Sequence, residues 1–316
     1  MRQPPPAGLA RWPSRSAMLS HDAQCVAAGI TTVFDALCIG DIGFEKARVQ
    51  TFEDGVADLN ALNGRGILKA EHFLHLRCEL PAPEMPGLLD RVIDDPLVRL
   101  ISLMDHSPGM GQYADVDRYR RMREADGFAE HEITEIVTGL QANHAAYHQT
   151  NRDIVLELVH HRDIPIASHD DRTAEEVIRN HKEGITISEF PVALAAARTA
   201  HAHAVKIIAG APNIVRGGSH SGNVAVLDLV REGLLDALAS DYVPAAMMEA
   251  VFACVQQNEL TIPQALALVT AGPADLVNLA DRGRIATGLR ADFVQVHLHE
   301  GIPVIRAVWR VGHRVA

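Results

Sequence analysis

Apolar runs of strand length alternate along this chain with longer segments of helical periodicity. This alternation is typical of βαβ units, whose strands form a parallel sheet. The apolar runs predict strands at residues 31–36, 72–79, 98–105, 164–169, 186–189, 204–209 and 235–240. The intervening periodicity predicts helices at residues 20–28, 44–63, 85–94, 115–162, 173–182, 192–203, 224–232, 245–257 and 262–271. Seven strands are one fewer than a closed (β/α)8 barrel requires, so we expect a barrel of this type in which one strand is missing or unrecognised.

Polar residues follow two of the predicted strands near the end of this series. Asn213, Arg216, Ser219 and His220 lie in a glycine-rich segment, 210–223, and Asp241 follows the next strand. In a (β/α)8 barrel the loops after the strands open on one face, which carries the active site. Arginine among glycine N–H groups suits an anionic oxygen, and an aspartate suits a metal ion or a proton. The alternative is a glycine-rich turn that carries a solvated arginine.

The composition excludes several classes of protein. A chain of 316 residues with 47% hydrophobic residues is long enough for one large barrel, and its net charge of -11 argues against a nucleic-acid surface. The four cysteines form no close pair, which favours a reducing cytoplasm over a disulfide-bonded or zinc-knuckle protein. No apolar leader or uninterrupted membrane span is present, so we expect no membrane partner. The sequence leaves open whether the protein is a homo-oligomer.

The C-terminal segment has a different pattern from the rest. Glycines at 283 and 288 precede two stretches of alternating apolar residues, which predict two or three antiparallel strands joined by glycine turns. We therefore divide the chain into a barrel, residues 1–280, and part of a β-sandwich appendage, residues 281–316.

Motifs along nearly the whole chain resemble one branch of the amidohydrolase superfamily, the triphosphate diphosphatases of the carbon-phosphorus lyase pathway. They lie at residues 75–79, 105–109, 167–171, 188–191, 210–223 and 240–242, and the Gly-x-x-x-x-Gly-x-x-Ala-Asp motif starts at Gly283. The resemblance implies a hydrolase that converts α-D-ribose 1-methylphosphonate 5-triphosphate to the 5-phosphate and pyrophosphate during alkylphosphonate catabolism. Such a reaction needs neutralisation of phosphate charge and deprotonation of water, which a divalent metal ion provides.

The resemblance also implies roles for individual residues. His169 and Asp241 match the histidine after the fifth strand and the aspartate after the eighth. Both are expected to be catalytic metal ligands, and the aspartate also to take a proton from the attacking water. Further metal ligands are Glu79, His106 and Glu189, for which the alternatives are a surface glutamate, a phosphate-binding imidazole and a bond to a neighbour. Triphosphate oxygens are expected to contact Arg77, Asn213, Arg216, Ser219 and His220. Zn²⁺ or Mn²⁺ is the expected ion, although mixed histidine and carboxylate ligands leave its identity open.

One departure from the family pattern is visible at the N-terminus. Family members carry a first barrel strand ending in His-x-Asp, which supplies two metal ligands, whereas this chain begins in a proline-rich segment. The missing strand is therefore expected to be the first one. Two alternatives to the diphosphatase remain: an enzyme of the same superfamily that cleaves a C–N bond, and an inactive fragment that lacks two ligands.

Overall fold

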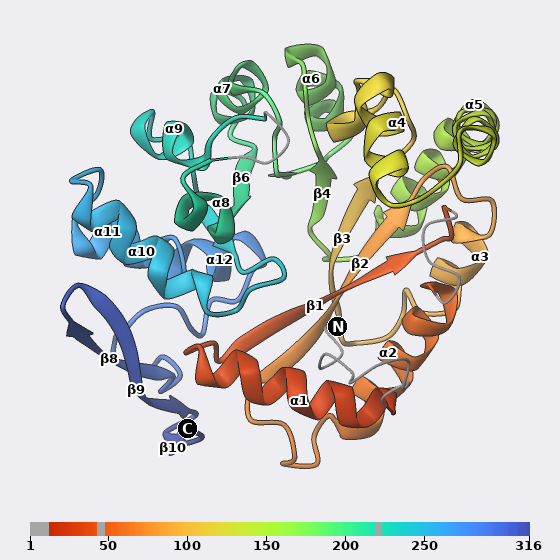
Figure 1. Cartoon of the computed structure of the whole chain (residues 1–316). Coiled ribbons are helices and arrows are strands. Elements are labelled where there is room, and N and C mark those ends of the chain that lie inside the picture. Colours follow the sequence, from red (N-terminus) through yellow and green to blue (C-terminus); the bar gives the residue numbers. More distant parts are fainter. Residues whose placement is uncertain (1–12, 43–47, 219–222) are drawn as a thin grey trace.

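A curled parallel sheet forms the centre of the molecule (Figure 1). The computed structural model describes residues 13–42, 48–218 and 223–316. Seven strands pair in chain order, each parallel to the next. Their bounds are β1 Thr32–Ile39, β2 Glu71–Glu79, β3 Val98–Met104, β4 Ile166–His169, β5 Ile187–Glu189, β6 Lys206–Gly210 and β7 Ala237–Ala239. All seven predicted strands are confirmed, and within the described residues β1 and β7 remain the two edges of the sheet.

Helices connect the strands and cover the outer face of the sheet (Figure 1). Before β4 lie α1 Ser14–Ala27, α2 Arg48–Leu62, α3 Met85–Asp90, α4 Val116–Ala125 and α5 Glu130–Val159, with a short 3-10 helix, η1, at Gly111–Tyr113. After β4 lie α6 Ala174–Lys182, α7 Leu194–Ala202, α8 Ala211–Arg216, α9 Val226–Arg231, α10 Ala246–Gln256, α11 Ile262–Ala267 and α12 Ala271–Leu276.

Three expectations about helices and loops were wrong. The single helix expected at 115–162 is two helices, because Gly127 has a φ of 94° just after α4 and the Glu132 side chain accepts from Ala129 N at the start of α5. The expected helix 262–271 ends at Ala267, and α12 starts separately. The glycine-rich segment 210–223 begins as a helix, α8, with Pro212 in its first turn and Gly217 in the left-handed conformation after its end.

The inner face of the sheet changes from apolar to polar along the strands. Alternate residues of a strand share a face, so Phe73, His75, Arg77 and Glu79 of β2 all lie on the inner side. Near the strand starts, this face is filled by an apolar cluster of Leu100, Ala167, Ile187 and Ala237 with Ala274, Leu276, Val277 and Leu279. Much of that filling comes from α12, which closes the bottom of the half-barrel. The strand ends therefore carry polar side chains, and a buried apolar cluster fills the space near the strand starts.

The outer face is mainly apolar, and a buried polar group of His72, Asp22 and Asp35 interrupts it near the strand starts. Leu74, Leu76 and Cys78 of β2 pack with residues of α1, α2, α3 and α5 in one buried cluster. A second cluster joins the later strands to the helices that follow them, with Ile207, Ala209 and Leu238 at its centre. These two clusters fix the curvature of the sheet by holding helices against the side away from the polar strand ends.

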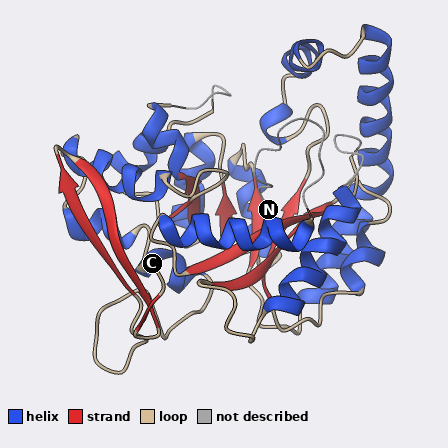
Figure 2. Ribbon diagram, turned by 60° about the horizontal axis from the view of Figure 1, so that its bottom comes forward, coloured by secondary structure: helices blue, strands red, loops and turns tan. Residues whose placement is uncertain are grey.

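The C-terminal segment forms the predicted antiparallel sheet. β8 Phe293–His299 pairs with β9 Ile302–Arg310, which pairs with β10 His313–Arg314. Figure 2 shows this hairpin at one side of the molecule, with the long helix α5 at the other. Among the described residues, no helix combines the length and the apolar character that a membrane span needs.

Candidate active site

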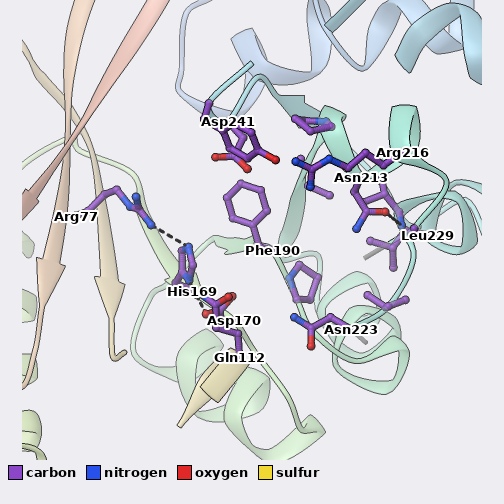
Figure 3. Close-up of a pocket in the computed structure, with 18 residues that line it drawn as sticks. Arg77, Gln112, His169, Asp170, Phe190, Asn213, Arg216, Asn223, Leu229 and Asp241 are labelled. Atoms are coloured by element: carbon purple, nitrogen blue, oxygen red, sulfur yellow. Dashed lines mark hydrogen bonds and ion pairs between the residues drawn. The ribbon is translucent and has the colours of Figure 1, made fainter. Parts of the chain in front are cut away.

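A cavity of about 250 Å³ opens at the carboxyl ends of the strands (Figure 3). Its lining includes five residues that the sequence predicted for the site, Arg77, His169, Asn213, Arg216 and Asp241. They come from β2, β4, α8 and the segment after β7, which are far apart in the sequence. The parallel arrangement of the strands brings their ends to one rim and so gathers these side chains.

Left-handed backbone conformations recur at this rim. Asp170, Phe190 and Asp241 follow β4, β5 and β7, and their φ angles are 57°, 55° and 50°. A positive φ is uncommon for residues other than glycine, and such strained residues cluster at functional sites. All three residues line the cavity. The chain thus turns sharply after three of its strands to present these side chains to one space.

Glu79 and His106 form a buried pair beside the cavity. His106 Nδ1 donates to Glu79 Oε1 at 2.6 Å, and Arg48 Nη1 lies 3.4 Å from the same oxygen. Burial raises the pKa of Glu79, but His106 and Arg48 lower it below its usual value. The other oxygen, Oε2, is buried and has no hydrogen-bond partner within the part of the chain that the structure describes. An ionised carboxylate with one unsatisfied buried oxygen suits a cation.

His106, His169 and Asp170 could hold a metal ion together. Each offers one ligand atom, and these atoms lie within 4.8 Å of one another. His169 Nδ1 is 3.2 Å from Asp170 Oδ2, and the rings of His106 and His169 are 5.7 Å apart. Burial lowers the pKa of His169, but the adjacent Asp170 carboxylate raises it above the usual histidine value. This donor set of imidazoles and carboxylate, with Glu79 Oε2 nearby, fits a divalent cation.

Glu189 is occupied by a different interaction. Its Oε2 accepts from Ser102 Oγ at 2.6 Å, and Ser102 Oγ accepts from His75 Nε2 at 2.6 Å. Burial lowers the pKa of His75 to about 4, so this ring is neutral at pH 7. Glu189 therefore ends a hydrogen-bonded chain across the inner face of the sheet and lies outside the group of His106, His169 and Asp170.

Two arginines face the cavity from opposite sides (Figure 3). Arg77 points inward, with Nη2 3.4 Å from His169 Nε2 and Nε 3.1 Å from Met104 Sδ. The guanidinium of Arg216 lies 5.3 Å from the ring centre of Tyr242. In the described part of the chain, neither arginine forms an ion pair with a carboxylate, so both guanidinium groups can contact an anionic ligand in the cavity.

Asp241 completes the rim of the cavity. Its side chain is exposed to the cavity rather than buried in a salt bridge. Partial removal of the carboxylate from water within the cavity raises the pKa of Asp241, while the charge of Arg77 opposes this effect. A carboxylate with a raised pKa is a stronger base than an ordinary aspartate.

Of the other residues predicted to contact phosphate, the structure places Asn213 but does not describe Ser219 and His220. Asn213 Oδ1 accepts from Val226 N at 3.0 Å at the start of α9, so only its Nδ2 group is left for a ligand. Ser219 and His220 lie outside the described residues. The sequence analysis missed Asp170 as a site residue, although an aspartate directly after the strand-end His169 is the signal that could have identified it.

Comparison with known proteins identifies the family. The Amidohydrolase family matches residues 23–313. The alpha-D-ribose 1-methylphosphonate 5-triphosphate diphosphatase of Escherichia coli strain K12 is 44% identical over 307 residues, which are 96% of this chain and 81% of that protein.

Solved structures of other enzymes share the fold of this chain. An N-acetylglucosamine-6-phosphate deacetylase from Thermotoga maritima has a TM-score of 0.57 at 14% identity, over 96% of this chain and 84% of that one. A dihydropyrimidinase from Brevibacillus agri has a TM-score of 0.57 at 10% identity, over 93% and 78% of the two chains. At these identities the likeness concerns the fold alone, and it agrees with the barrel-type sheet described above.

Proposed function

Because this chain belongs to the amidohydrolase family, we propose that it hydrolyses α-D-ribose 1-methylphosphonate 5-triphosphate to the 5-phosphate and pyrophosphate. The identity of 44% with a diphosphatase of that name supports this substrate. The four cysteines are free thiols, which suits a reducing compartment, and we place the reaction in the cytoplasm.

The observation that carries the proposal is a pair of arginines in one cavity with an aspartate, neither arginine being ion-paired to a carboxylate among the described residues. A triphosphate brings several negative charges, and guanidinium groups bind phosphate oxygens in bidentate fashion. Arg77 and Arg216 both line the cavity from different elements, so the two cations would hold different parts of one polyanion. Electrostatic stabilisation of this kind contributes most of the rate enhancement in phosphoryl transfer.

The metal ligands in this proposal are His106, His169, Asp170 and Glu79. The geometry that supports them is the group of three ligand atoms within 4.8 Å and the unsatisfied Glu79 Oε2. A divalent cation bound there, Zn²⁺ or Mn²⁺, neutralises phosphate charge and lowers the pKa of a water molecule. His106 is held by Glu79, and His169 by Asp170, so both imidazoles are oriented before any ligand binds.

Asp241 is the proposed proton acceptor. Hydrolysis to the 5-phosphate and pyrophosphate forms a bond between a water oxygen and phosphorus and breaks the bridging phosphoanhydride bond. The proton released by the water passes to the Asp241 carboxylate, which lies at the rim of the same cavity. Glu189 would act indirectly, by holding Ser102 and His75 under the site.

The test is pyrophosphate release from the ribose triphosphate, measured with Zn²⁺ or Mn²⁺ present. We expect pyrophosphate as the product and a fall in kcat of about 10²–10⁴ in Asp241→Asn, the range for loss of a general base. Asp228→Asn is the matched control, since Asp228 pairs with Arg231 on the outer surface.

Stepwise release of inorganic phosphate would contradict the proposed bond cleavage. Cleavage of an N-acyl or cyclic amide substrate, without any pyrophosphate release, would replace the proposal by the C–N hydrolase alternative.

A further inference from the structure

A second group of metal-ligand side chains lies where α5 crosses the end of β3. Asp105 Oδ2 is 2.6 Å from His144 Nδ1 and 2.6 Å from His148 Nδ1. The two imidazole rings are 4.8 Å apart, between centres. None of the three side chains is among the residues that line the described cavity. The group is therefore separate from the candidate active site, although Asp105 precedes His106 in the chain.

The fold holds these side chains in place from both directions. His144 and His148 are four residues apart on α5 and so project from one face of the helix. On that face, Gln141 Nε2 donates to Pro108 O at 3.3 Å. Asn151 lies about one turn after His148 on the same helix. Its Nδ2 donates to Leu80 O at 2.8 Å and to Ala82 O at 2.9 Å. The helix is thus anchored on each side of the histidine pair.

Asp105 is oriented as firmly as the histidines. Its Oδ1 accepts from Ser107 N at 2.9 Å, which leaves Oδ2 directed at the two rings. The exposed fraction of its side chain is 8%, against 32% for His144 and 16% for His148. The carboxylate is inside the protein, while the histidine side is open enough to admit an ion and water.

The three side chains converge as the ligands of one ion would, and their present N–O distances of 2.6 Å are those of hydrogen bonds. Two nitrogen atoms converge on a single oxygen, and the three atoms lie within 4.8 Å of one another. Zinc ligands stand about 2.0–2.2 Å from the ion, so tetrahedral ligand atoms are separated by roughly 3.3–3.6 Å. Small rotations of the two partly exposed rings would create that separation. The two imidazoles offer nitrogen donors, and the carboxylate offers a negative charge that a divalent cation offsets.

We propose that Asp105, His144 and His148 bind a divalent transition-metal ion, Zn²⁺ by preference, with water completing its coordination. Two imidazoles with one carboxylate form a ligand set that zinc accepts. The ion links α5 to the end of β3 and so supports the segment that carries His106. Its role is structural, and it is distinct from any ion in the cavity.

The experiment compares metal content and Co²⁺ absorption among variants of the whole chain. After equilibration with Zn²⁺ and gel filtration, His144→Gln/His148→Gln is expected to retain about one equivalent fewer than the unchanged chain. In the Co²⁺-loaded variant, the visible absorption from the ion bound to these two imidazoles is expected to be lost. Zn²⁺ is also expected to raise the Tm of the unchanged chain more than that of this variant.

The control is His160→Gln/His161→Gln, which removes a histidine pair in edge-to-face contact at the end of the same helix. Its metal content should equal that of the unchanged chain. Equal metal content in all three proteins would overturn the proposal, as would an equal loss in the control, which would indicate adventitious surface binding.

Two further variants separate loss of the metal site from loss of folding and from metal binding in the cavity. If the double variant does not fold, as judged by circular dichroism, Asp105→Asn tests the same site, with an expected loss of zinc affinity of at least about tenfold. Glu79→Gln removes a cavity ligand and should leave the Co²⁺ spectrum of the α5 site unchanged. A spectrum abolished by Glu79→Gln alone would assign the ion to the cavity and refute a separate site.

Discussion

Arg77 illustrates how a single residue acquires its function from its strand position. It lies two residues before Glu79 and two after His75, so all three side chains share the inner face of β2. The resulting environments differ: His75 lies in the hydrogen-bonded chain to Glu189, Arg77 faces the cavity, and Glu79 pairs with His106. Depth along one strand therefore separates the side chain proposed to support the site from the one proposed to bind the ligand.

At the residue scale, Arg216→Ala should weaken substrate binding. Hydrogen bonds to charged groups contribute about 1.5–3 kcal/mol, so we expect kcat/KM to fall by about ten- to a hundredfold, mainly through KM. Steady-state kinetics of pyrophosphate release measures this. The control is Arg198→Ala, because Arg198 pairs with Glu232 on the outer surface and should leave both constants unchanged. An equal effect of the two substitutions would show that Arg216 contributes only to the overall charge.

At the scale of elements, a buried charged network joins α1 to β1 and β2. His72 Nε2 is 3.1 Å from Asp22 Oδ1, and His72 Nδ1 is 2.7 Å from Asp35 Oδ2. The Asp22 carboxylate also accepts from the backbone N–H groups of Lys69 and Ala70. Burial alone would lower the pKa of His72, but the hydrogen bonds and charges of Asp22 and Asp35 raise it to about 9. The network is therefore an ionised cluster between a helix and the sheet.

This network predicts a decrease in stability at alkaline pH. The folded pKa of His72 lies above its unfolded value, so its contribution is complete below about pH 6.5 and is lost as the pH rises through 9. The shift corresponds to about 3 kcal/mol. The pKa values of Asp22 and Asp35 are lowered by His72 and other donors despite burial, so their contributions are lost on the acid side, below about pH 4.

Urea unfolding of the unchanged chain and of His72→Gln between pH 6 and 9.5 tests the alkaline effect. The variant should be less stable at pH 6 by about 3–5 kcal/mol, the cost of breaking a buried ion pair, and its stability should vary less with pH. The same slope in both proteins would mean that other groups cause the alkaline loss.

The docking of α12 beneath the sheet depends on a glycine. A Cβ atom at Gly272 would lie 2.1 Å from Asp236 O, a backbone atom that cannot move without the strand β7 that follows it. We expect Gly272→Ala to lower the free energy of unfolding by several kcal/mol, beyond the usual 0.5–3 kcal/mol of point substitutions.

A matched glycine substitution should act in the opposite direction. Gly139 lies within α5, and a Cβ atom there would meet nothing within 4 Å. Gly139→Ala should raise the free energy of unfolding by about 0.5–1 kcal/mol, because alanine loses less backbone entropy in a helix. Thermal or urea unfolding measures both variants, and a stabilising effect of Gly272→Ala would contradict the close approach to Asp236.

At the scale of the whole molecule, the C-terminal segment is tied to the barrel through one carboxylate. Glu71 at the start of β2 accepts from Arg282 and Arg290, which precede the antiparallel sheet. Apolar contacts add to this tie, since Val26, Ala70 and Val308 form one buried cluster. The barrel and the appendage therefore share both an ionic and an apolar contact.

Glu71→Ala should loosen the appendage. Without the Glu71 carboxylate, the partly buried guanidinium groups of Arg282 and Arg290 lose this partner. We expect the free energy of unfolding to fall by about 1–3 kcal/mol and hydrogen exchange in β8 and β9 to increase. Hydrogen–deuterium exchange of the whole chain measures the effect. Glu53→Ala is the control, because the exposed pair of Glu53 with Arg91 contributes little. Unchanged exchange in both variants would mean that the apolar cluster alone holds the appendage.

The seven parallel strands, the antiparallel tail and five of the residues that line the cavity were predictable from the sequence. Those features depend on local periodicity and on polar residues at strand ends, which can be read along the chain. It did not show that Asp170 joins His106 and His169, that Glu189 is held by Ser102, or that Arg216 is on a helix rather than in a loop. Nor did it show that His144 and His148, thirty-nine and forty-three residues after Asp105, meet that carboxylate. These contacts follow from the folded structure alone, because each depends on which side chains the curvature of the sheet and the packing of its helices bring within bonding distance.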